Sequence, residues 1–161
     1  MASTSASSSS MTSTSASSSS SVGASGTCPG ESVIIDLGAT PITLQGDTTG
    51  ASDKFVDDQS GLPGSDCLGG SYAGPDRVYA VTPSASGTLT ATLTATYAAP
   101  YIHVRTACPG IPSDEVACQW SDSEPNTVTL AVTSGTTYYV VADGWGGGDV
   151  GGSFTLALSL L

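Results

Sequence analysis

The chain has 161 residues and a formal net charge of −11, because 14 acidic side chains face only three basic ones, Lys54, Arg77 and Arg105. So acidic a surface repels phosphate backbones and anionic lipid headgroups, which argues against nucleic acid and membrane surfaces as partners. The length suits one domain with a single core, and no apolar run approaches the length that spans a bilayer.

Residues 1–27 form a tail of low complexity. It opens with two near-identical blocks, MASTSASSSS and MTSTSASSSS, which carry no charge. Such a segment buries too little apolar surface to offset its ordering entropy. Two interpretations stay open, a flexible linker or leader and an O-glycosylated stalk. For the stalk, the candidate glycosylation sites are Ser3, Thr4, Ser5, Thr12, Ser13, Thr14 and Ser15.

Residues 28–161 indicate one all-β domain. Asp supplies 11 of the 14 acids, and Asp favours turns over helices. Runs rich in Val, Thr, Tyr, Ile or Leu, bounded by Gly, Pro, Ser or Asp, predict strands. These runs cover residues 32–37, 41–45, 77–82, 87–97, 101–106, 116–120, 127–133, 136–142 and 152–160. Eight or nine short strands of this kind indicate a jelly-roll-like β-sandwich.

Alternation is clearest over residues 88–96, where Leu and Ala alternate with Thr. This pattern directs Leu89 and Leu93 to a core and the Thr row to water. A single Thr strand is no two-dimensional array of the ice-binding kind, so an ordinary polar sheet face is favoured. Such a face could also dock against a neighbouring subunit.

Four cysteines, Cys28, Cys67, Cys108 and Cys118, contain no Cys-x-x-Cys pair. Zinc is therefore poorly supported, and disulfides formed in an oxidising compartment explain the even number better. Of the three connectivities, we favour Cys108–Cys118 with Cys28–Cys67. No charged-then-apolar export signal lies in this numbering, so a secreted chain would have lost it or carried it elsewhere.

The segment 46–74 is a long loop rich in Asp and Gly. Calcium takes six to eight oxygens, often from several loop carboxylates. The candidate ligands are Asp53, Asp57, Asp58, Asp66 and Asp76. The alternative is that these residues are solvated turn-formers, since their spacing fits no defined calcium loop. We expect that no cofactor is required and that calcium is the one candidate ion.

Several short motifs together resemble the bacterial pre-peptidase C-terminal domain group. They are GDTTGASD at 46–53, Cys67, GPDRVYAV at 74–81, GTL at 87–89, Cys108 with Cys118, GTTYYVVADG at 135–144 and GSFTL at 152–156. The resemblance implies a secreted, non-catalytic β-sandwich that usually accompanies an exported enzyme, and related collagen-binding domains bind calcium through loop carboxylates. No enzyme accompanies the domain in this sequence, which favours an independent role.

Two tryptophans, Trp120 and Trp145, could offer flat faces for sugar stacking. The alternative is that each indole closes an end of the sandwich with its N–H at the surface. Trp145 belongs to the glycine-rich segment 143–152, which reads better as a hairpin loop than as one copy of a calcium-binding repeat.

Catalysis has little support in the sequence. The one histidine, His103, alternates with Tyr101 and Arg105 opposite Ile102 and Val104, and we expect it at the surface. No Gly-x-Ser-x-Gly elbow supplies a nucleophile, and nothing singles out a glycosidase carboxylate pair. We therefore expect a protein that is not an enzyme.

Two functions follow from these observations. The first is a secreted or cell-surface structural or adhesive protein that self-associates, as the repeating subunit of a glycosylated filament. A donated strand would join its subunits, with Val33, Ile34 and Ile35 as candidates. The second is a calcium-stabilised accessory module, of the secreted-hydrolase type, that binds a polysaccharide or a matrix protein.

Overall fold

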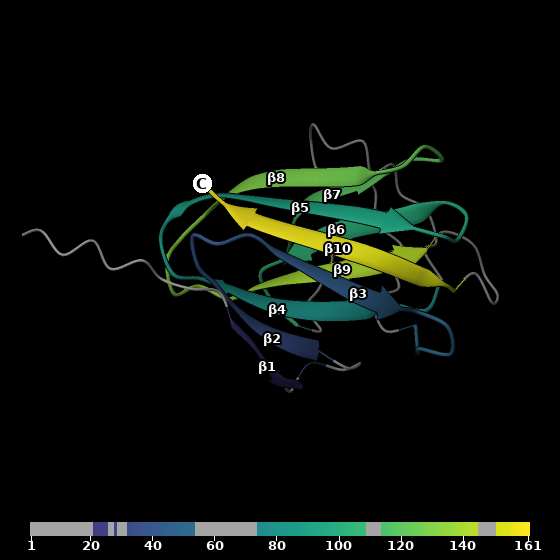
Figure 1. The fold of residues 1–161 in the computed structure, drawn as a ribbon, viewed down its shortest axis with the longest axis horizontal. Coiled ribbons are helices and arrows are strands. Elements are labelled where there is room, and N and C mark those ends of the chain that lie inside the picture. Colours follow the sequence, from purple (N-terminus) through teal and green to yellow (C-terminus); the bar gives the residue numbers. More distant parts are fainter. Residues whose placement is uncertain (1–20, 26–27, 29–31, 54–73, 109–113, 145–150) are drawn as a thin grey trace, which may run out of the picture.

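The structure is a computed structural model that describes residues 21–25, 28, 32–53, 74–108, 114–144 and 151–161. These residues form ten strands and two sheets that pack face to face (Figure 1). The strands are β1 (Ser21–Ser25), β2 (Ser32–Leu37), β3 (Ile42–Asp47), β4 (Arg77–Pro83), β5 (Gly87–Ala95), β6 (Pro100–Arg105), β7 (Glu115–Trp120), β8 (Asn126–Val132), β9 (Tyr138–Gly144) and β10 (Ser153–Leu160).

One sheet has six strands in the order β1-β2-β4-β9-β6-β7, and the other has four in the order β3-β10-β5-β8. All neighbours are antiparallel except β2 and β4, which run parallel with Val33 opposite Tyr79. The predicted β-sandwich is therefore confirmed, and each predicted strand corresponds to one of β2 to β10. The structure adds one strand, β1, which lies in the segment expected to be a linker and pairs with β2.

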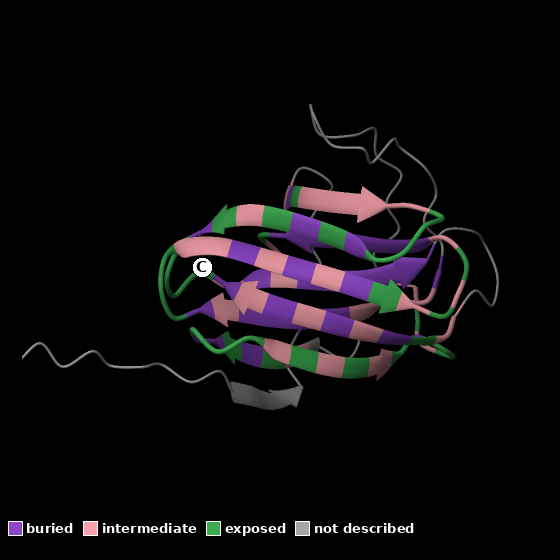
Figure 2. Ribbon diagram, turned by 45° about the horizontal axis from the view of Figure 1, so that its top comes forward, coloured by how far each residue is buried: buried purple, intermediate pink, exposed green. Residues whose placement is uncertain are grey.

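The core lies between the two sheets. Leu89, Ala91 and Leu93 of β5 are fully buried, as the alternation predicts, and they meet Ile102 and Val104 of β6 in one cluster. Strands β5, β8 and β10 of the four-stranded sheet alternate between buried and more exposed residues, and β3 alternates between half-buried and exposed ones (Figure 2), because only one face of the sheet is covered. The sequence pattern of period two therefore carries directly into packing.

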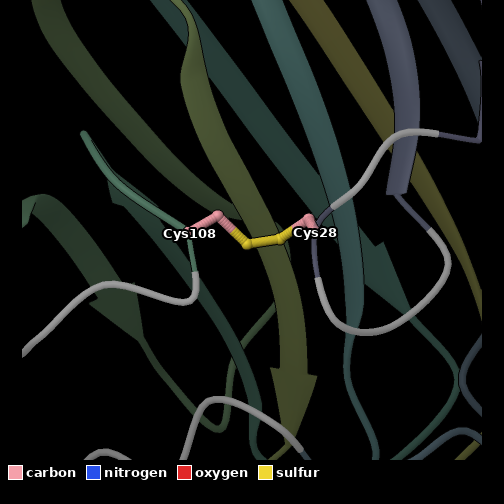
Figure 3. The surroundings of a disulfide bond; sticks show 2 residues. All are labelled: Cys28 and Cys108. Carbon is pink, nitrogen blue, oxygen red and sulfur yellow. A yellow bond between two sulfur atoms is a disulfide. The ribbon is translucent and has the colours of Figure 1, made fainter.

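The six-stranded sheet differs at its centre, because β4, β6 and β9 are buried on both faces along most of their length. Val78 and Val141 point away from the main core, yet they are fully buried under Cys28 in a second cluster. Cys28 forms a disulfide with Cys108, 80 residues away in sequence, and the Cα atoms are 5.6 Å apart (Figure 3). This bridge crosses the outer face of β4 and β9 and covers the two valines.

The disulfide pairing expected from sequence is wrong. Cys28 pairs with Cys108, so neither Cys108–Cys118 nor Cys28–Cys67 forms. Cys118 is also disulfide-bonded, and Cys67, the fourth cysteine, lies outside the described residues. Proximity along the chain misled the prediction, because a sheet brings distant segments together over one face.

Candidate functional site

One end of the sandwich gathers residues that carry chemistry. Strands β3 and β9 end here, and β4 and β10 begin here, so segments far apart in sequence meet. The backbone N–H of Thr48 donates to Gly152 O at 3.0 Å, and the N–H of Gly152 donates to Thr48 Oγ1 at 3.1 Å. These bonds tie the start of the Asp-rich segment to the Gly-rich segment before β10.

Two buried carboxylates, Asp76 just before β4 and Asp143 near the end of β9, lie at this end. Asp76 is 1% exposed and Asp143 is 0% exposed. Arg77 lies opposite Ala142 in the β4–β9 ladder, so one residue further on Asp76 stands opposite Asp143. Asp143 Oδ1 accepts the N–H of Gly144 at 2.6 Å. The sequence indicated Asp76 as a candidate ligand but not Asp143. The feature that could have indicated Asp143 is its position as an acidic residue at the end of an apolar strand.

Gly74 lets the backbone approach this pair. A Cβ atom on Gly74 would lie 2.5 Å from Gly144 O and 3.1 Å from Asp143 Oδ1. Any side chain there would therefore displace the end of β9. The glycine allows the long segment after β3 to return to the sheet directly against Asp143.

Asp47, at the end of β3, fixes the neighbouring corner. Its Oδ1 accepts the N–H of Thr49 at 2.7 Å and its Oδ2 accepts the hydroxyl of Ser153 at 3.0 Å. Hydrogen bonds from Thr49, then from Ser153, and the nearby charge of Arg77 hold the pKa of Asp47 below its ordinary value. Arg77 Nε also donates to the Asp47 carbonyl at 2.8 Å. Asp47 is thus a structural anchor for a turn.

The predicted calcium ligands are only partly described. Asp76 lies at the end of the sandwich described above, and Asp53 follows β3 and is half-buried. Asp57, Asp58 and Asp66 lie outside the described residues. Within the described ranges, no three His, Cys, Asp or Glu side chains are grouped so that they could hold a metal ion.

A second cluster of charged residues lies on the outer face of β6 and β7. His103 is 0% exposed, and Arg105 and Glu115 are also buried. His103 Nδ1 lies 3.2 Å from Glu115 Oε2 and accepts a hydrogen bond from Arg105 Nε at 3.2 Å. The Tyr101 hydroxyl donates to Glu115 at 3.4 Å, and its ring stacks on His103 with centroids 4.9 Å apart.

The expectation that His103 lies at the surface is therefore wrong. The alternation was read correctly, since Ile102 and Val104 face the main core and His103 faces away. The outer face is itself covered, so that both faces of β6 are buried. Period-two alternation identifies the face on which a side chain lies, and it cannot show that the second face is also packed.

The outer face of the four-stranded sheet has a consistent chemistry. Its outward side chains are Ser, Thr, Ala or Gln across all four strands, with no charge until Asp47 at the edge. Thr92 Oγ1 and Thr127 Oγ1 lie 3.0 Å apart, and Thr90 Oγ1 and Thr129 Oγ1 lie 3.5 Å apart. The Thr row of β5 therefore extends into a two-dimensional array, which the single strand did not predict.

The remaining candidates fall in different places. Trp120, at the end of β7, is half-buried and packs against Tyr101. Trp145 and the candidate glycosylation sites of the tail lie outside the described residues. Val33, Ile34 and Ile35 lie in β2, which pairs with β1 and β4 of the same chain, and Ile35 is fully buried.

Comparisons with known proteins identify the fold. The pre-peptidase C-terminal domain of a collagenase from Bacillus anthracis superposes with a TM-score of 0.54 at 12% identity, over 83% of this chain and 100% of that domain. PliG from Aeromonas hydrophila, a periplasmic inhibitor of g-type lysozyme, gives a TM-score of 0.49 at 14% identity, over 81% of this chain and 99% of that one. No family model and no curated protein matches the sequence.

The chain therefore has the β-sandwich fold of a pre-peptidase C-terminal domain, as the resemblance in sequence implies. The shared identity is low, so the likeness concerns the fold alone. In the described part of the chain, no helix has the length and apolarity needed to cross a membrane.

Proposed function

We propose that the chain is a non-enzymatic, extracellular β-sandwich with a structural or adhesive role, as the repeating subunit of a surface assembly. The observation that carries this proposal is the uncharged outer face of the four-stranded sheet. A net charge of −11 elsewhere on the molecule favours repulsion between like copies. The Ser, Thr and Ala face is the broad surface through which contact meets least repulsion.

The geometry of this face suits contact with an extended surface. Strands are spaced by about 4.8 Å and alternate residues by about 6.8 Å, so hydroxyl and methyl groups form a regular lattice. Thr side chains are stiff at χ1, and the pairs Thr92–Thr127 and Thr90–Thr129 restrict them further. Little side-chain entropy is lost when such a surface binds.

An extracellular location is supported by the disulfides. The Cys28–Cys108 bridge covers the apolar side chains Val78 and Val141, so it is part of the packed structure. Structural disulfides of this kind persist in oxidising compartments. The Ser/Thr tail would then carry O-linked glycans at the hydroxyls identified from sequence.

A non-catalytic role is supported by the state of His103. It is fully buried, and its Nδ1 contacts Arg105 and Glu115. A general base must reach its substrate directly or through one water molecule. A histidine held in this way stabilises the sheet instead of exchanging protons with a substrate.

Electron microscopy of the extracellular material from the producing cells tests this proposal. We expect regular assemblies, or coated surfaces, that contain the intact chain. The variant Thr92→Glu places a charge at the centre of the uncharged face and should abolish them. The control Thr136→Glu adds the same charge at an exposed turn and should leave them intact. Dispersed wild-type particles that attach to no surface would overturn the proposal.

A second candidate is a calcium-stabilised module that binds polysaccharide or matrix protein. The observation that favours it is that two buried carboxylates, Asp76 and Asp143, lie at the end of the sandwich where the Asp-rich segment returns to the sheet. A ligand that binds only the folded state raises the melting temperature by mass action. We expect calcium to raise Tm and a chelator to lower it, with the effect lost in Asp143→Asn. A Tm that responds to neither addition would reject this candidate.

A further inference from the structure

Strand β3 is an open edge of the four-stranded sheet. It pairs with β10 on one side, and no described strand pairs with the other. Thr43 and Gln45 are exposed on the outer face, next to this edge. An unpaired edge is a template for another strand, because its backbone donors and acceptors point into open space.

The direction of the backbone groups follows from the β3–β10 register. Thr48 N–H donates to Gly152 O, so the even-numbered residues of β3 exchange hydrogen bonds with β10. Thr43 and Gln45 therefore direct their N–H and C=O groups away from β10. The carbonyl of Asp47 confirms this direction, because it accepts a bond from Arg77 on that side.

Two of the other sheet edges, those of β8 and β1, carry features that disfavour further pairing. The edge N–H of Thr127 in β8 donates to Gln119 Oε1 at 2.8 Å, so a side chain from β7 occupies it. Strand β1 has a register irregularity, which disfavours further pairing. Strand β3 has a regular register with β10, its side-chain contact on the outward side is that of Arg77 with the Asp47 carbonyl at its end, and residues 42–46 contain no charge and no proline. Natural sheets usually blunt an edge with such features.

Apolar side chains lie under this edge. Ile42 and Leu44 of β3, and Val33 of β2, are only half-buried although they pack against the main core. A strand added to β3 would extend the four-stranded sheet beside these half-buried side chains. The added strand would therefore gain apolar burial as well as backbone hydrogen bonds.

We infer that the β3 edge binds the β3 edge of a second copy of this chain, in antiparallel orientation, to form one continuous sheet. The charge pattern favours antiparallel pairing with a strand that is itself uncharged, as residues 42–46 of a second copy are. Asp47 is the one charge on β3 and lies at its end. Antiparallel pairing centred on Leu44 separates the two Asp47 side chains by about 20 Å, beyond the Debye length of about 8 Å. Parallel pairing would place them next to each other.

This register also satisfies the backbone. With Leu44 opposite its symmetry mate, Thr43 of each copy lies opposite Gln45 of the other. Each of these two pairs exchanges two hydrogen bonds, which uses the outward groups of both residues. The interface is isologous, so it closes into a dimer, and larger assemblies need the separate Ser, Thr and Ala face. The pairing thus rests on, and extends, the proposed structural role.

Sedimentation velocity of the full, oxidised chain over a concentration series tests the pairing. A short edge interface buries less than the roughly 1,600 Å² of a standard interface, so we expect a weak, reversible dimer. Salt should strengthen it, because each copy carries −11 and the paired segment carries no charge.

The variant Thr43→Pro removes an outward N–H from each copy. Proline is tolerated on an edge strand when its N–H side faces solvent, and circular dichroism checks the fold. We expect Kd to rise at least about tenfold, equivalent to about 1.4 kcal/mol. The control is Thr43→Ser, which keeps the outward N–H and a side-chain hydroxyl at the same position. It should change Kd by less than about twofold.

A second pair of variants keeps the test decisive if proline disturbs the fold. Thr43→Asp places a carboxylate diagonal to Asp47 of the partner copy and should weaken the dimer, whereas Thr136→Asp, at an exposed turn, should not. A monomeric wild type at every concentration, or equal effects of matched variants, would overturn the pairing. If the monomer still attaches to surfaces in a Thr92-dependent way, only the β3 inference fails and the proposed function stands.

Discussion

The buried cluster around Glu115 predicts a large stability loss when one charge is removed. Glu115 lies within hydrogen-bonding distance of Tyr101 and His103, and its Oε2 is 3.9 Å from an Arg105 guanidinium nitrogen. The variant Glu115→Gln keeps the volume and removes the negative charge beside a buried guanidinium. Removing one partner of a buried ion pair costs about 3–5 kcal/mol. We therefore expect the free energy of unfolding to fall by about 3 kcal/mol.

Equilibrium denaturation in urea, with the disulfides intact, measures this loss. The exposed Asp122→Asn is the control and should change the free energy of unfolding by less than about 0.5 kcal/mol. The double variant Glu115→Gln, Arg105→Met removes both charges, and it should recover part of the loss because no buried charge is left beside an uncharged partner. A single variant as stable as the control would refute the electrostatic coupling of the cluster.

Three further predictions concern packing, pH and the disulfide. Gly46→Ala would place a Cβ 2.2 Å from Phe154 Cζ, so we expect a loss of about 1–3 kcal/mol by denaturant unfolding, and an unchanged midpoint would contradict the contact. Burial raises the pKa of Tyr79 to about 12 from its ordinary value of 10.0, so its protonated form stabilises the fold below pH 10 and this stability is lost as pH rises toward 12. The Tm of Tyr79→Phe should therefore fall less steeply than the wild-type Tm as the pH rises over that range. Identical curves of Tm against pH would refute the assignment. Replacing Cys28 and Cys108 by Ser should cost about 4 kcal/mol, because the bridge closes a loop of 80 residues, and calorimetry showing no change in Tm would contradict this.

Local patterns predicted the strands well and the pairing between distant segments poorly. The Leu and Thr alternation of β5 identified its core face because one face of that sheet meets water. The same reasoning placed His103 at the surface, although it is buried, because the sequence of β6 does not indicate that the outer face of this strand is also covered. The Thr array depended on β8 lying beside β5, which is a matter of topology and not of local sequence.

The acidic site shows the same division. Asp76 stood out within an Asp-rich segment, whereas Asp143 was a single acid in a glycine-rich run. Their placement at one end follows from the β4–β9 ladder, whose paired residues lie 57 to 65 positions apart in sequence. The Cys28–Cys108 bridge likewise depends on which segments cross the outer face. Sequence reasoning therefore finds candidate residues, and topology decides which of them meet.

The Cys28–Cys108 bridge also determines how the domain would respond to a mechanical load. Tension applied through the N-terminal segment and the C-terminus would first detach β1, which precedes the bridge. The force would then pass directly from Cys28 to Cys108 and bypass the chain between them. Those 80 residues would otherwise lengthen by about 270 Å at full extension. The covalent link keeps β2 to β6 out of the path of the force, so a tethered copy would stay short and folded under loads that separate its outermost strand.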